Sequence, residues 1–379
     1  MTGRRYRIAL FGLLITCLLT TLSFHTAQGR VDLAGDYAGG GKKVTLPPIE
    51  NTPTPTPSII ADVLAVQAKA SEPVQISSGG CCPYPQWSSD SEFVLYVDSV
   101  GEQGAGLYGV PVEGGPPAFL TSRVGSYSQD LSLVAYPEAG LVYVERWAIG
   151  DRWLVPSQGR EVFLSHENEW IAWEYGSTSI QNQDLKQRTI WIANIKGEAA
   201  RELVTVHGGR FLGWISHGQA VIVSGRLSPL SPAGIWRVDR ETGAAVLLFG
   251  TDKPRDVLIS PEGEWLVFTV AFQTDRTKNG IWVSKTDGTS MSRLPAYGSY
   301  RWRSEGELLL IPYDFESDRP YLWQFSVNSN DIWALTNPAD TDLTIANNDW
   351  QPSPDGEKIV FYSSEDRNLW VLELPDTAQ

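Results

Sequence analysis

The feature that most constrains this chain is a serine-containing turn that recurs seven times, each time followed by an apolar run. An acidic, glycine or amide residue follows each serine, and residues of these types favour tight turns. The apolar runs, such as Phe93–Tyr96 and Trp265–Phe268, are rich in β-branched and aromatic residues and predict buried strands. The seven serines are Ser88, Ser128, Ser165, Ser216, Ser260, Ser304 and Ser353. Because one such unit cannot bury both of its faces, the copies must pack against one another.

A second repeated position has the same period. An aliphatic residue followed by an aromatic one recurs once per unit with a mean spacing of roughly 44 residues, which is typical of a four-stranded propeller blade. The pairs are Leu107-Tyr108, Val142-Tyr143, Ile190-Trp191, Ile235-Trp236, Ile281-Trp282, Leu322-Trp323 and Leu369-Trp370. The sequence therefore predicts an all-β fold, a β-propeller of seven four-stranded blades. Blade two, between Ser126 and Pro156, has few residues for its strands, and a six-bladed ring is the alternative if that blade is irregular.

Two copies of the unit carry a fuller motif. Residues 350–361 read Trp-x-x-Ser-Pro-Asp-Gly-x-x-Ile-Val-Phe, and residues 260–268 read Ser-Pro-Glu-Gly-Glu-Trp-Leu-Val-Phe. This motif resembles the repeat of TolB-like, WD-repeat-related β-propellers, although the other five copies keep only the serine and the strand. The resemblance implies the propeller fold, a bacterial cell-envelope setting and the recognition of partner proteins. TolB proteins place an α/β domain before a six-bladed propeller, whereas here a short linker stands in that place and the count is seven.

The last unit lacks an outer strand of its own. Blades one to six each have a fourth apolar segment, but only Pro375–Gln379 follows Leu374. Glu72–Ile76 stands before blade one without a partner, so we expect it to pair beside Leu369–Leu374 and complete blade seven. This exchange closes the ring and removes the exposed strand edges that promote aggregation.

The N-terminal part of the chain predicts export. Residues 1–29 have a basic start, an apolar segment and small residues before a predicted cleavage after Gly29, as in a signal peptide, with an uncleaved anchor as the alternative. Residues 30–71 form a Pro/Gly/Thr-rich linker with a possible short helix, and residues 72–379 form the propeller domain. We expect the mature protein to be secreted or located in the periplasm or cell envelope, with no membrane span unless the signal remains uncleaved.

Charge and cysteine content exclude several function classes. The formal net charge of −14 repels nucleic acid and anionic lipid, so neither is predicted as a partner. No cofactor and no metal site are predicted, because no spacing of Cys or His offers the four ligands of a zinc site. Cys81 and Cys82 could form a vicinal disulfide or remain two separate thiols, and the sequence leaves both readings open.

Few residues suggest catalysis. No G-x-S-x-G motif is present, and His166 and His217 each follow a turn serine, so both are interpreted as turn-surface residues. Most of the 15 tryptophans, such as Trp236 and Trp282, occupy repeated positions and are interpreted as packing residues rather than as a platform for sugars. The acidic residues of the serine turns are expected to accept hydrogen bonds from turn amides: Asp90, Asp130, Glu167, Glu262 and Asp355.

The loops between second and third strands carry the variable surface. We therefore predict an exported, non-catalytic binding module that presents these loops to a protein or glycan partner. Aromatic and arginine side chains supply most of the affinity at interfaces, so the predicted binding residues are Tyr175, Arg226, Phe272, Tyr313 and Phe315. The alternative is an extracellular polysaccharide- or lactone-processing enzyme with acidic residues in the central channel. The sequence does not predict the oligomeric state.

Overall fold

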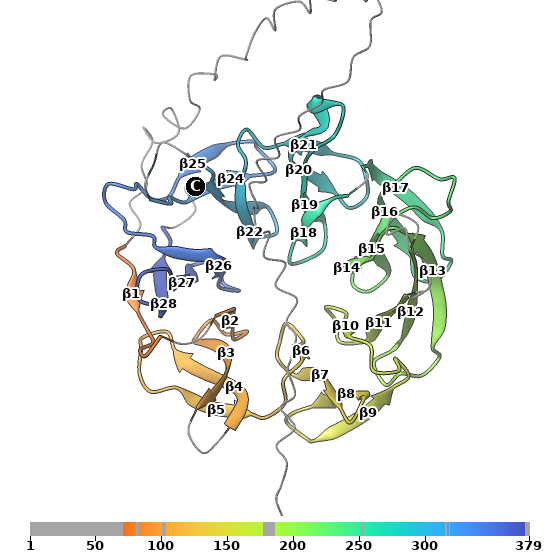
Figure 1. Ribbon diagram of the computed structural model, residues 1–379, viewed down its shortest axis with the longest axis horizontal. Helices are drawn as coiled ribbons and strands as arrows, with labels where there is room; N and C mark the ends of the chain where they lie inside the picture. The colour runs from red at the N-terminus through yellow and green to blue at the C-terminus, as the bar shows by residue number, and fades with distance from the viewer. Residues whose placement is uncertain are drawn as a thin grey trace, which may run out of the picture. The chain divides into compact units, whose positions relative to one another are not determined.

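Seven antiparallel sheets of four strands each form a ring (Figure 1). The computed structural model describes residues 71–80, 83–100, 104–176, 186–251, 253–314, 317 and 319–375. The predicted export signal, linker and short helix, and the Cys81-Cys82 pair, lie outside these residues. The predicted all-β, seven-bladed propeller is confirmed, and the six-bladed alternative is wrong, because blade two forms a regular four-stranded sheet. No helix in the described part of the chain is long and apolar enough to cross a membrane.

In blades one to six the strands follow one another in chain order from the innermost to the outermost. Blades one and two contain β2 (Gln86–Trp87), β3 (Phe93–Val100), β4 (Gly104–Pro111), β5 (Ala118–Thr121), β6 (Ser126–Tyr127), β7 (Leu133–Glu138), β8 (Leu141–Arg146) and β9 (Asp151–Val155). Blades three and four contain β10 (Val162–Leu164), β11 (Trp170–Gly176), β12 (Gln187–Asn194), β13 (Arg201–His207), β14 (Phe211–Ile215), β15 (Ala220–Gly225), β16 (Gly234–Asp239) and β17 (Ala245–Gly250).

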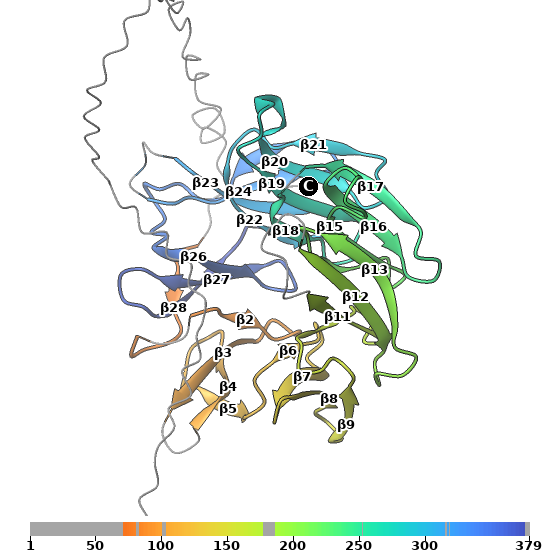
Figure 2. The same cartoon turned by 45° about the vertical axis from the view of Figure 1, so that its right-hand side comes forward.

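Blades five to seven complete the ring. Blades five and six contain β18 (Arg255–Ile259), β19 (Trp265–Val270), the 3-10 helix η3 (Arg276–Lys278), β20 (Gly280–Lys285), β21 (Met291–Arg293), β22 (Gly298–Ser304), β23 (Glu307–Pro312), β24 (Trp323–Ser326) and β25 (Ile332–Ala334). Blade seven contains β26 (Ile345–Pro352), β27 (Lys358–Ser363), β28 (Leu369–Glu373) and, as its outermost strand, β1 (Val74–Gln75). Figures 1 and 2 both show blade seven beside blade one.

The repeated serine holds the turn between the first and second strands. In five blades its Oγ accepts a hydrogen bond, at 2.9 to 3.1 Å, from the backbone N–H five residues later. The five pairs are Ser88 with Phe93, Ser128 with Leu133, Ser165 with Trp170, Ser260 with Trp265 and Ser353 with Lys358. A side chain that bonds the backbone locally in this way stabilises a turn rather than a continuing strand. Ser216 and Ser304 have turns one residue shorter, and neither makes this bond within the described part of the chain.

Three turn carboxylates accept a backbone N–H as predicted, namely Asp90, Asp130 and Asp355. In blade five the prediction for Glu262 is wrong, because Glu305 of blade six takes that role. The Glu305 carboxylate accepts from Ser260 Oγ at 2.6 Å and from the N–H groups of Glu262 and Glu264 at 2.6 and 3.0 Å. This carboxylate therefore ties the turns of two neighbouring blades together.

Tryptophans at one repeated position join blades one, four and six to the blade before each of them. The indole Nε1 donates to a backbone carbonyl in the innermost strand of the preceding blade, at 3.0 to 3.3 Å. The pairs are Trp87 with Gln351, Trp214 with Phe163 and Trp302 with Leu258. All three tryptophans are buried, so a polar N–H that would be costly to bury alone is satisfied between blades. Their interpretation as packing residues is confirmed.

Blade seven is closed by the N-terminal strand, as predicted. Strand β1 pairs antiparallel with β28, with Val74 opposite Val371 and Gln75 opposite Trp370. The Ile76 N–H then donates to the Leu369 carbonyl at 2.9 Å, and the Leu369 N–H donates to Ser77 Oγ at 2.8 Å. The regular strand is shorter than the predicted span of residues 72–76. The Ile76 side chain, 3% exposed, packs in the core between blades seven and one.

Ile76→Asp should lower the free energy of unfolding by about 3 kcal/mol, because it places a carboxylate in that core. Val74 lies two residues earlier and is 59% exposed, so Val74→Asp should change the same quantity by less than about 0.5 kcal/mol. Denaturant unfolding of the two variants measures both values. Equal destabilisation by the two substitutions would contradict a buried closure at Ile76.

The lowered pKa of Asp130 makes the stability of the fold depend on pH. Burial alone would raise its pKa, but hydrogen bonds from Ser128, Ser132 and Asn168 outweigh burial and lower the pKa to about 2. The ionised carboxylate therefore stabilises the fold above about pH 4, and this contribution is lost as the pH falls to about 2. Asp130 is exposed, so the contribution is small.

Asp130→Asn should accordingly lower the thermal midpoint at neutral pH, and the difference from the wild-type protein should shrink as the pH falls from about 4 to about 2. Asp340→Asn, which removes one exposed charge from a loop, serves as the control. A difference between Asp130→Asn and wild type that stays constant over this range would refute the assigned role.

Candidate functional site

The two ends of the ring differ in their loops. One end, called the turn face, carries the seven serine turns. The other end, called the loop face, carries the connections between second and third strands, such as residues 226–233, 271–279 and 319–322, and the connections between blades. Since adjacent strands are antiparallel, the innermost strands also begin at the loop face. Long loops on a rigid scaffold are where binding residues concentrate, so this face is the candidate site.

A cavity of about 360 Å³ on the loop face brings two predicted residues together. Arg226, from the β15–β16 connection, and Phe272, from the β19–β20 connection, both line it, as do Lys253 and Arg255. The Arg226 Nη1 donates to the Ser231 carbonyl at 2.9 Å, which holds the guanidinium in the cavity wall. The Arg255 guanidinium carbon lies 5.4 Å from the centre of the Phe272 ring, within the range of a cation–π contact.

Phe272 has an unusual backbone and an unusual exposure. Its φ of 61° lies in the left-handed region, which costs a bulky residue free energy. Its side chain is 87% exposed, so no burial in the fold offsets that cost. A strained, exposed aromatic side chain at a loop tip is typical of a residue kept for binding rather than for folding.

Tyr313 lies in a second cavity of the loop face, also of about 360 Å³, between blades six and seven. Its side chain is 60% exposed. In the same cavity the Tyr321 hydroxyl donates to the Asp314 carboxylate at 2.9 Å. Burial, and then the nearby Asp314 carboxylate, raise the pKa of Tyr321, so its phenol keeps the proton that it donates. This cavity therefore offers the exposed ring of Tyr313 beside the Asp314 carboxylate, which already accepts the Tyr321 hydroxyl.

The other predicted residues have different surroundings. Tyr175 is half-buried at the end of β11, packs edge-on against Trp191 with ring centres 5.9 Å apart, and donates its hydroxyl to the Pro156 carbonyl at 3.0 Å. These contacts make it a packing residue of blade three as much as a surface residue. Phe315 lies outside the described residues. A binding role for Arg226, Phe272 and Tyr313 stays a prediction that their positions permit.

Two exposed residues of the loop face were absent from the prediction. Leu230, in the β15–β16 connection, is 97% exposed, and Tyr84, directly before β2, is 74% exposed. Leu230 cannot be identified from the sequence, because an aliphatic residue in a loop carries no periodic signal. Tyr84 lies in the stretch before blade one, which the repeat pattern does not cover.

Acidic residues of the loop face are partly engaged within the chain. Glu174 accepts from Arg188 Nη1 at 2.7 Å and from the Phe211 N–H. Asp275 accepts from the Thr277 N–H at 3.0 Å and caps η3, and the hydroxyl and amide of Thr277 lower the pKa of Asp275. Asp184, Glu316 and Asp318 lie outside the described residues.

Two carboxylates lie near Arg301 on the innermost strands. Burial lowers the pKa of Arg301, while Asp256 and Asp349 act in the opposite direction. Burial raises the pKa of Asp349. The Tyr84 N–H, which donates to the Asp349 carboxylate at 2.7 Å, and the charge of Arg301 both lower this pKa, but burial outweighs them. A carboxyl group whose pKa is raised by burial is the kind of group that an enzyme uses as an acid. These are the acids that the alternative, enzymatic function would use.

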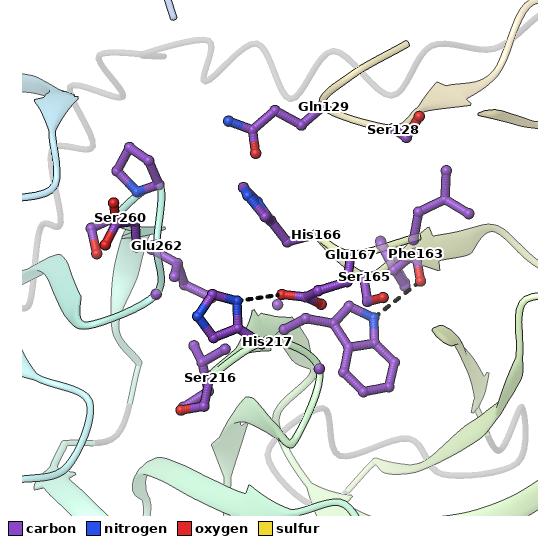
Figure 3. A pocket seen from close by; sticks show the side chains of 18 of the residues that line it. Ser128, Gln129, Phe163, Ser165, His166, Glu167, Ser216, His217, Ser260 and Glu262 are labelled. Atoms are coloured by element: carbon purple, nitrogen blue, oxygen red, sulfur yellow. Dashed lines mark hydrogen bonds and ion pairs between the residues drawn. The ribbon is translucent and has the colours of Figure 1, made fainter. Parts of the chain in front are cut away.

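A further cavity, of about 430 Å³, opens on the turn face between the turns of blades two to five (Figure 3). Gln129, His166, His217 and Glu262 line it. The His217 Nδ1 lies 3.1 Å from the Glu167 Oε1, so Glu167 pairs with a histidine of the next blade and not with a turn amide as predicted. No group of three or more His, Cys, Asp or Glu side chains that could hold a metal ion occurs among the described residues.

Comparison with known proteins identifies the fold. The sequence matches no protein-family model and no curated protein. Among solved structures it is similar to an oligogalacturonate lyase in complex with manganese, with a TM-score of 0.57 and 12% identity over 82% of this chain and 97% of that one. An oligogalacturonate lyase from Vibrio parahaemolyticus gives a TM-score of 0.53 and 10% identity over 81% of this chain and 92% of that one.

A TolB structure from Agrobacterium tumefaciens also matches, with a TM-score of 0.39 and 16% identity over 68% of this chain and 92% of that one. The chain is a seven-bladed β-propeller in fold. Similarity at these identities extends to the fold alone, so the site must be argued from the residues of this propeller.

Proposed function

We propose that this TolB-like propeller is an exported, non-catalytic binding module that holds a protein or glycan partner on its loop face. The observation that carries the proposal is the position of exposed hydrophobic side chains. The three that are most exposed among the described residues, Leu230, Phe272 and Tyr84, all belong to the loop face, and Tyr313 belongs to it as well. Their exposed fractions are 97%, 87%, 74% and 60%.

Exposure of large hydrophobic side chains on one face supports binding there. Single exposed apolar residues are common on soluble proteins, but several on one face mark an interaction surface. Aromatic anchors in particular supply most of the affinity at protein interfaces, and aromatic rings also stack on sugars. The ring of seven sheets keeps these anchors in fixed relative positions, so little ordering is needed when a partner binds.

The second candidate is a polysaccharide-processing enzyme. The observation that favours it is the pair of carboxylates near Arg301, of which Asp349 has a pKa raised by burial. The similar fold of two oligogalacturonate lyases is compatible with this candidate. The binding module is preferred because Leu230, Phe272 and Tyr84 lie at exposed positions of the loop face, where a large partner can reach all three.

Photo-cross-linking in the native host tests the proposed function. A benzophenone amino acid at position 230 or 272 should cross-link to a specific partner, because both side chains extend into solvent on the loop face. The same amino acid at position 246, on the outer strand β17 where Val246 is 53% exposed, is the matched control. Gel analysis and mass spectrometry detect the adducts.

Two results would contradict the proposal. One is a set of adducts from position 246 that equals those from positions 230 and 272. The other is turnover of oligogalacturonate by the purified protein, seen as ultraviolet absorbance of an unsaturated product and lost in Asp349→Asn, which would favour the enzyme.

A further inference from the structure

An arginine lies just before or within the innermost strand of five consecutive blades, two to six. In blades two to five it lies at or near the start of that strand, which is at the loop face, and in blade six Arg301 is the fourth of the seven residues of β22. The five residues are Arg123, Arg160, Arg210, Arg255 and Arg301. In three of these blades the arginine precedes the turn serine by the same interval, as Arg255 precedes Ser260. The arginines therefore form an arc around the loop-face end of the ring.

The two ends of the arc are engaged within the propeller. The Arg123 Nε lies 3.2 Å from the Glu145 carboxylate. Arg301 donates to the carbonyls of Tyr300 and Asn348 at 2.7 and 3.3 Å. Both residues are only partly exposed. These two arginines serve the fold.

The three arginines in the middle of the arc are different. Arg160, Arg210 and Arg255, in blades three, four and five, are exposed. None of them forms an ion pair with a carboxylate of the described residues, and the one ring contact is that of Arg255 with Phe272. An exposed guanidinium that the chain itself does not pair is available for a carboxylate of another molecule.

Neighbouring side chains increase the positive charge here. Arg160 shares a cavity of about 330 Å³ with Lys186 and Arg188, and Arg255 shares its cavity with Arg226 and Lys253. Glu161 and Asp256 follow Arg160 and Arg255 in the chain and reduce this charge, while Glu174 in the first cavity is already paired with Arg188. Positive charge therefore predominates locally on a chain whose net charge is −14.

The turn face carries a repeated set of carboxylates. The serine turns place carboxylates from five blades on the turn face: Asp90, Asp130, Glu167, Glu262 and Asp355. An acidic ligand is repelled from that face and attracted to the arginines of the loop face, which orients its approach.

We infer that the loop face of blades three to five binds an acidic segment of a protein partner. This inference rests on the proposed function and names the chemistry of the partner. The carboxylates of the segment pair with Arg160, Arg210 and Arg255, while its apolar side chains contact Phe272 and Leu230. A protein fits better than a glycan because Leu230, the most exposed of these side chains, is aliphatic and has no ring face for a sugar. Arginine and aromatic residues together are typical of protein interfaces.

Fluorescence anisotropy with a defined probe tests the inference. The probe is a fluorescein-labelled peptide of repeated Glu-Glu-Leu units, and the wild-type protein should bind it with an affinity that falls as salt is added. The variant R160Q/R210Q/R255Q should bind about tenfold more weakly, because three charge-assisted contacts are lost. The variant R160K/R210K/R255K keeps the charge and should retain most of the affinity.

The matched control is R146Q/K196Q/R201Q, which removes the same charge from exposed residues at the turn-face ends of third and fourth strands. It should bind the peptide as the wild-type protein does. Equal loss in the control and in R160Q/R210Q/R255Q would overturn the inference, since net charge alone would then explain binding. Absence of peptide binding by the wild-type protein, or tighter binding of labelled oligogalacturonate than of the peptide, would overturn it as well.

The same variants separate this inference from the proposed function. If cross-linking from position 272 persists unchanged in R160Q/R210Q/R255Q, the loop face still binds its partner but the acidic segment is refuted. Cross-linking from positions 230 and 272 could instead be absent in the wild-type protein while the Glu-Glu-Leu peptide still binds. The proposed function is then refuted, and the inference that the arginines bind an acidic peptide stands.

Discussion

The pairing of β1 with β28 is the interaction on which the rest of the ring depends. Six blades are built from continuous stretches of chain, so their strands meet through short turns. Blade seven instead joins residues from the two ends of the described chain. Only two residue pairs of regular strand make this connection, and burial of Ile76 between blades seven and one adds to it. A propeller without this closure would expose the edge of β28 and one side of the core.

Rigidity and variability are divided between the two faces. On the turn face, the Oγ of five repeated serines and the carboxylates of Asp90, Asp130, Asp355 and Glu305 satisfy turn amides, so little freedom remains there. Among the described residues, the second-to-third-strand connections of the loop face share no such repeated side chain. Its residues are therefore free to differ between blades, and the strained Phe272 and the exposed Leu230 lie there. The repeated residues build the scaffold. The residues that differ from blade to blade form the proposed binding surface.

The fold could be predicted because packing residues repeat. Packing residues such as Ser353, Trp87 and Ile76 contact neighbouring strands at fixed positions of the repeat. Their spacing alone therefore indicates the blades and the closure of the ring. Glu305 could not be foreseen, because its carboxylate bonds the turn of another blade and spacing along the chain does not indicate contacts between turns. Tyr175 and Phe272 looked alike in sequence, but one packs on Trp191 and the other extends into solvent. Loop conformation, which separates them, follows no period.

The arginine arc could have been found in the sequence. Arg123, Arg160 and Arg255 each precede a turn serine by the same interval, which is a repeat signal in three of the seven blades. Repeated positions usually indicate packing residues, and a charged residue at the start of a strand does not fit that interpretation. Whether such a residue is paired within the chain depends on distances to carboxylates, which only the folded structure provides.

A disulfide between β1 and β28 tests the closure most directly. The variant V74C/V371C, with the native cysteines replaced by serine, places thiols on residues that face each other in the register. Closure predicts that mild oxidation forms an intramolecular disulfide in most molecules, and that this bond raises the free energy of unfolding by up to about 4 kcal/mol. The pair V246C/V371C, on blades four and seven, should remain reduced. Free thiols in folded V74C/V371C, labelled as fast as those of the control pair, would contradict the closed ring.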